Sequence, residues 1–110
     1  MTIKFETTPD AISAVNEMLN DIIKAPALNI DSKVAKSVAY DISDKFSSRQ
    51  KAINKKADLF QAKKKYGITL KFHEAYALQQ ILLHAINDVD NDMTKNELNK
   101  VKDTINQKMS

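Results

Sequence analysis

Glycine and proline are unusually scarce in this chain. Its 110 residues include one glycine and two prolines. A fold made of many short strands needs turn residues at every chain reversal, and this chain has too few to supply them. Long helices joined by a few connections need far fewer turn residues. The scarcity therefore predicts an all-α fold, and the length predicts a single domain over residues 1–110.

Apolar side chains recur at three- and four-residue spacing, which is the periodicity of an amphipathic helix. The pattern predicts four helices, at about 9–25, 32–66, 70–89 and 94–109. Gly67 is expected to end the long second helix as a left-handed C-cap, because glycine adopts that conformation without steric cost. Residues 1–8, where Ile3 and Phe5 alternate with polar residues, are expected to form an extended arm.

The third predicted helix, at about 70–89, carries apolar side chains around most of its circumference. A helix that is apolar nearly all round is buried, so this one is expected to lie at the centre of the fold. The four helices are then expected to pack as a small antiparallel bundle.

Basic residues concentrate between Arg49 and Lys65. This segment holds seven basic residues and one acidic residue, so it carries +6 in a chain whose net charge is +3. A row of lysines on a helix can neutralise phosphates and release their counterions, although a merely solvated outer face explains the same residues. The residues expected to contact the backbone of a nucleic acid, or an acidic protein, are Arg49, Lys51, Lys55, Lys56, Lys63, Lys64, Lys65 and Tyr66.

The predicted length of the second helix also suggests an interface. A helix over residues 32–66 would be longer than the helices that cover it, since each residue adds about 1.5 Å. Some of its apolar positions are therefore expected to remain uncovered and to meet a second copy or another partner. The positions predicted for such an interface are Phe46, Ile53 and Phe60, and an antiparallel homodimer is the simplest arrangement.

Two histidine and aspartate motifs resemble metal sites without completing them. His73 and Glu74 begin a zincin-like sequence, but the second histidine that the motif needs is replaced by Ala77. Asp88, Asp90 and Asp92 match the first three ligands of a calcium-binding EF-hand loop. The glycine and the terminal glutamate of that loop are absent, so no metal site and no cofactor are predicted.

Catalytic chemistry has little support in the composition. The chain has no cysteine, and a single glycine cannot build a phosphate-binding glycine loop. The longest stretch without Asp, Glu, Lys or Arg is thirteen residues, at 75–87, against the roughly 20 that a transmembrane helix needs. We therefore expect a cytoplasmic protein that is not an enzyme and does not insert into a membrane.

The combination of a small helical bundle with one basic helix is similar to bacteriocin immunity proteins and to small phage and plasmid accessory proteins. No motif selects one of these groups. The expected function is non-catalytic binding by a phage or mobile-element accessory protein, acting in the host cytoplasm through its lysine-rich helix face. The alternative is a protein–protein interaction module, such as an immunity-like, inhibitor or structural protein, that binds through exposed apolar positions of the long helix.

Overall fold

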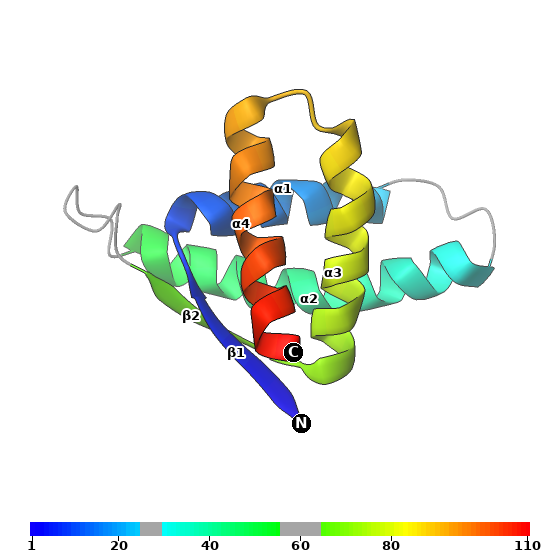
Figure 1. Ribbon diagram of the computed structural model, residues 1–110, viewed down its shortest axis with the longest axis horizontal. Helices are drawn as coiled ribbons and strands as arrows, with labels where there is room; N and C mark the ends of the chain where they lie inside the picture. Colours follow the sequence, from blue (N-terminus) through cyan, green and yellow to red (C-terminus); the bar gives the residue numbers. More distant parts are fainter. Residues whose placement is uncertain (25–29, 56–64) are drawn as a thin grey trace.

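The computed structural model describes residues 1–24, 30–55 and 65–110, which form four α-helices and a two-stranded sheet (Figure 1). In chain order the elements are β1 (Thr2–Thr7), α1 (Pro9–Lys24), α2 (Ile30–Lys55), β2 (Tyr66–Lys71), α3 (Phe72–Ala85), the short 3-10 helix η2 (Ile86–Asp88) and α4 (Asp92–Met109). The predicted predominance of helix is confirmed. The sheet was not predicted, so the fold is mostly helical but not all-α.

The sheet is an antiparallel ribbon of β1 and β2. Ile3 lies opposite Leu70 and Phe5 lies opposite Ile68, and all four side chains are buried. Successive side chains of a strand point to opposite faces, so the intervening polar residues of both strands lie on the outer face of the ribbon. The extended arm expected at residues 1–8 is therefore a paired strand over most of its length.

Two predicted helix boundaries are wrong because β2 occupies the residues concerned. The second helix does not continue to Tyr66, which begins β2, and the third begins at Phe72 instead of residue 70. Gly67 is not a left-handed cap, since no described residue has a positive φ angle. The apolar residues of 66–71 follow a period of two, and pairing with β1 satisfies the backbone groups that a helix would otherwise have satisfied.

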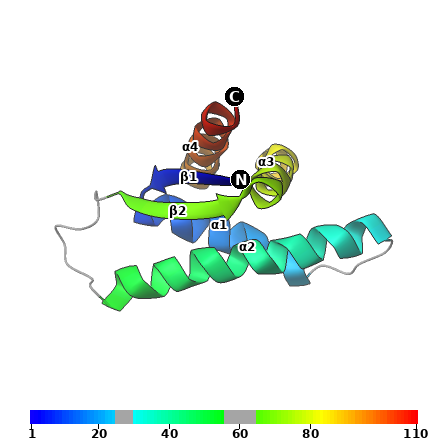
Figure 2. The same ribbon diagram turned by 90° about the horizontal axis from the view of Figure 1, so that it is seen from below.

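The helices form two antiparallel pairs that cross each other, α1 with α2 and α3 with α4 (Figure 1). The sheet lies between α2 and α4, with β2 facing α2 and β1 facing α4 (Figure 2). The single antiparallel bundle predicted from the sequence is not confirmed. Within the described ranges, none of the helices is both long and apolar enough to cross a membrane.

Helix α1 is more continuously buried than α3. The buried residues of α1 are Ala11, Ile12, Ala14, Val15, Asn16, Met18 and Leu19. Those of α3 are fewer, namely Glu74, Ala75, Leu78 and Leu82. Phe72, Tyr76 and Leu83 of α3 remain exposed. The prediction of a buried central helix at 70–89 is therefore wrong, because α3 keeps part of its apolar circumference on the surface.

Candidate functional site

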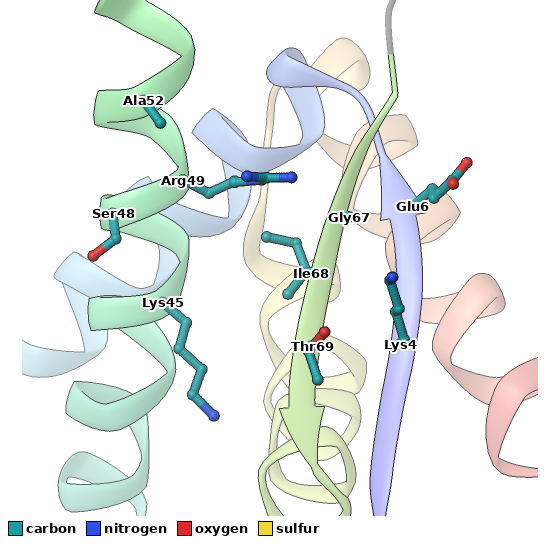
Figure 3. Close-up of a pocket in the computed structure, with 9 residues that line it drawn as sticks. All are labelled: Lys4, Glu6, Lys45, Ser48, Arg49, Ala52, Gly67, Ile68 and Thr69. Carbon is teal, nitrogen blue, oxygen red and sulfur yellow. The ribbon is translucent and has the colours of Figure 1, made fainter.

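A groove of about 490 Å³ lies between α2 and the sheet (Figure 3). Two elements distant in sequence supply its charged walls, with the sheet on one side and the second half of α2 on the other. We call it the basic groove. Its nine lining residues are Lys4, Glu6, Lys45, Ser48, Arg49, Ala52, Gly67, Ile68 and Thr69.

Local structure explains how the three cations reach the basic groove. Lys4 lies between the buried residues Ile3 and Phe5, so strand alternation places its side chain on the outer face of the ribbon. Lys45 and Arg49 are four residues apart on α2, which places them one turn apart on the same side of the helix. The groove thus receives one cation from β1 and two from α2.

Arg49 is held at the start of β2 by an aromatic contact. Its guanidinium carbon lies 5.7 Å from the centroid of the Tyr66 ring, within the range of a cation–π interaction. Arg49 is nevertheless exposed, so its N–H groups remain accessible from the groove. This contact brings together the first and the last of the contact residues that the sequence predicted, Arg49 and Tyr66.

Lys45 is neutralised by a buried carboxylate. Its ammonium donates a hydrogen bond to Glu74, whose side chain is only 4% exposed. The backbone N–H of Lys71 donates to the same carboxylate oxygen at 2.8 Å. Burial by itself raises the pKa of Glu74, but the hydrogen bonds from Lys45 and Lys71 and the charges of Lys45 and His73 hold that pKa below its usual value. Within the described residues, neither Lys4 nor Arg49 forms an ion pair.

The pairing of Glu74 predicts a loss of stability in acid. A carboxyl whose pKa is lower in the folded than in the unfolded state stabilises the fold above its unfolded pKa of about 4.3, and this contribution disappears as pH falls through the folded pKa. Glu74→Gln should therefore lower the urea midpoint at neutral pH and weaken its dependence on acid. The measurement is the urea midpoint of both proteins from neutral pH to about pH 3.

The matched control is Glu17→Gln, which removes an exposed carboxylate from α1. This variant should keep the parent's free energy of unfolding at neutral pH within about 0.5 kcal/mol. If the parent and Glu74→Gln lose stability in parallel as the pH falls, the proposed role of the Glu74 charge is wrong.

The structure locates part of the predicted basic segment. Lys51 is exposed on α2, and Lys65 is exposed directly before β2. Lys55 is the last residue of α2. Three further predicted contact residues, Lys56, Lys63 and Lys64, lie outside the described residues, as does Phe60. Sequence reasoning missed Lys4 and Lys45. Both had visible signals: Lys4 lies in an alternating apolar–polar stretch, and Lys45 is four residues before Arg49.

Two of the predicted interface residues lie in the core. Phe46 is fully buried, and its ring centroid lies 6.5 Å from that of Phe5. Ile53, two turns further along α2, is also buried. The prediction that these two side chains stand uncovered is wrong, because the sheet and α1 cover the face of α2 that carries them. Phe46 and Ile53 are therefore not available as contacts for the predicted homodimer.

Uncovered apolar side chains occur instead at a second groove. This apolar groove has a volume of about 570 Å³ and lies between the first half of α2 and α3. Val34 and Tyr76 are its exposed large side chains. The other lining residues are Ile22, Ala35, Val38, Ala77, Gln80, Ile81, His84, Ala85 and Asp88. The apolar groove shares no lining residue with the basic groove.

Acidic residues gather at a third location, between α1 and the connection to α4. Glu17 and Asp21 of α1 line a depression there together with Asp88 and Asp90. In the described parts of the chain, no three His, Asp or Glu side chains are placed to hold one metal ion. This depression shares no lining residue with the basic groove, where Glu6 is the one acidic side chain.

No family model, curated protein or solved structure matches this chain.

Proposed function

We propose that this protein is a non-catalytic nucleic-acid-binding protein that holds the phosphate backbone in the basic groove. The observation that carries the proposal is the convergence of Lys4 from β1 and Arg49 from α2 on one groove. Neither side chain is neutralised by an ion pair with a described residue, so both charges are available to a ligand. Cations that meet phosphates release condensed counterions, which is the main source of affinity in backbone binding.

The surroundings of the groove support the same ligand. Lys65 and Lys71 are exposed at the two ends of β2. The sequence from Lys45 to Lys71 contains nine basic residues and one acidic residue, so it carries +8 in a chain whose net charge is +3. A positive potential concentrated in this way raises the local concentration of a polyanion and its rate of association.

The polar chemistry of the groove favours binding without sequence preference. Ser48 and Thr69 line its two walls, and hydroxyl side chains commonly donate hydrogen bonds to phosphate oxygens. Base-edge recognition relies on arginine forks, and this chain has a single arginine, Arg49. We therefore expect contacts to phosphates to dominate.

Removing charges at the basic groove should reduce the salt dependence of DNA binding more than removing the same number of charges elsewhere on the surface. The test variant combines Lys4→Gln, Arg49→Gln and Lys65→Gln, and Lys45 is kept because it pairs with buried Glu74. Its logarithmic salt dependence for single-stranded DNA should be shallower than the parent's by about two, since each lost phosphate contact contributes roughly 0.7. Fluorescence anisotropy with labelled single-stranded and duplex DNA at several salt concentrations measures this.

The matched control combines Lys24→Gln, Lys33→Gln and Lys108→Gln, three exposed lysines that have no ion pair with a described residue and neither line the groove nor flank β2. It changes the net charge by the same amount and should retain most of the parent's salt dependence. An equal loss in both triple variants would mean that only net charge matters. If polyglutamate displaces the protein as efficiently as DNA does, an acidic protein is the better ligand class.

The apolar groove favours a second candidate function, that of a protein-interaction module. Its exposed Val34 and Tyr76 offer a contact surface without charge. A complex formed there should tolerate salt and should be weakened by Tyr76→Ala, because truncation of a large buried interface side chain removes binding energy. Nucleic-acid binding in the basic groove should instead weaken as the salt concentration rises and should not change in Tyr76→Ala.

A further inference from the structure

The chain's single glycine, Gly67, lies inside β2, where the backbone does not require it. No described glycine has a positive φ angle, and Gly67 pairs with Glu6 in the regular antiparallel register. Glycine weakens a strand, because it loses more conformational freedom on folding than other residues and has no side chain to pack. A glycine inside a strand often marks a place where another group approaches closely.

At Gly67 the approaching group is the side chain of Lys4. A Cβ atom added to Gly67 would lie 3.6 Å from the Lys4 Cε atom. Lys4 itself pairs with Thr69, so the end of its side chain reaches diagonally toward Gly67. Both residues line the basic groove, and Figure 3 shows them on neighbouring strands with α2 on the far side of β2.

The distance defines what this position can hold. A single methyl group at 3.6 Å makes an ordinary van der Waals contact with Lys4, so alanine fits. The two methyl groups of valine extend beyond that Cβ and meet the lysine stem. A branched residue at position 67 would therefore displace Lys4 while suiting the strand, because β-branched residues favour extended backbone.

We propose that Gly67 is a positioning residue of the basic groove, which keeps the space that allows the end of the Lys4 side chain to extend toward β2 and hold its ammonium in the groove. This inference rests on the proposed function only in taking phosphate as the ligand of that ammonium. Glycine at this position lowers the stability of the strand but leaves room for the Lys4 side chain. Its signature is that a branched substitution maintains or raises stability while it weakens anion binding.

The test compares Gly67→Ala and Gly67→Val, each made in the parent and in Lys4→Gln. The probe is a fluorescein-labelled oligo(dT) strand, and the melting temperature of each variant is measured in parallel. Gly67→Ala should bind within about twofold of the parent. Gly67→Val should melt no lower than the parent, but its salt dependence should be shallower by up to about 0.7, the contribution of one phosphate contact on a single strand.

The double variant separates positioning of Lys4 from mere obstruction of the groove. If Gly67 acts through Lys4, Gly67→Val should have no further effect on affinity once Lys4 is glutamine, since the two changes then remove the same contact. Additive losses would overturn the proposal. A parent-like affinity of Gly67→Val, when the parent itself binds with the expected salt dependence, would overturn it as well.

A second measurement is independent of any ligand. In the parent protein, NMR should detect a nuclear Overhauser effect between the Hα protons of Gly67 and the Hε protons of Lys4, and Gly67→Val should alter the Lys4 side-chain shifts. If the parent fails to bind oligo(dT) while these signals are present, the proposed function fails and the placement of Lys4 stands. Absence of the signals overturns the placement, whatever the protein binds.

Discussion

Leu82→Asp is expected to abolish the cooperative unfolding transition of this protein, whereas Leu83→Asp should leave it nearly intact. The two leucines are neighbours on α3, but Leu82 is 0% exposed and Leu83 is 46% exposed. An aspartate at position 82 would place a carboxylate among apolar side chains without a partner, which costs several kcal/mol or forces the group to remain protonated. That penalty approaches the total stability of about 5–15 kcal/mol of a typical domain.

Circular dichroism during thermal and urea unfolding measures the difference between the two variants. Leu83→Asp introduces the same residue into the same helix, so it controls for the helix propensity and the charge of aspartate. Exposed substitutions usually change stability by no more than about 0.5 kcal/mol. If both variants melt like the parent, Leu82 is not in the core and the packing of α3 on α4 is incorrect.

Phe46→Ala is expected to destabilise the fold by about 3–5 kcal/mol, the usual cost of truncating a buried phenylalanine. Phe46 is 0% exposed and joins α2 to the sheet through its contact with the ring of Phe5. Its removal would leave a cavity between two elements that cannot both move to fill it. Urea unfolding monitored by circular dichroism gives the change in free energy.

Tyr40→Ala provides the comparison on the same helix. Tyr40 is 54% exposed, so its truncation should cost far less, although it also removes an aromatic ring. The pair of variants also tests the interface role that the sequence assigned to Phe46. If Phe46 were an interface residue, Phe46→Ala would lower the association constant and leave the unfolding of the monomer unchanged. That result would contradict the core position.

The elements that the sequence predicts well are those with local signals. The first predicted helix, 9–25, differs from α1 (Pro9–Lys24) by one residue at its end, because Thr8 and Pro9 mark its start and one apolar stripe runs along it. The fourth, 94–109, differs from α4 (Asp92–Met109) by two residues at its start. Both have a periodic stripe and a capping residue within a few positions.

The sheet was missed because its evidence is divided between distant segments. Ile68 and Leu70 alternate over only six residues, and an apolar run of that length also fits the start of a helix. What fixes β2 as a strand is its pairing with β1, which no local pattern reveals. The basic groove has the same origin, since Arg49 was predicted as a site residue on its own, whereas Lys4 joins it only through the strand pairing.

The pairing of β1 with β2 also constrains the order in which the protein folds. Ile3 and Leu70 are opposite each other in the sheet, yet 67 positions separate them in the sequence. Contacts between distant segments form late, because closing the intervening loop costs entropy before any contact compensates for it. During synthesis, Ile3 and Phe5 leave the ribosome long before their partners exist, and they remain available to chaperones or to aggregation until β2 is complete. The groove that β1 helps to build is therefore among the last parts of the molecule to be assembled.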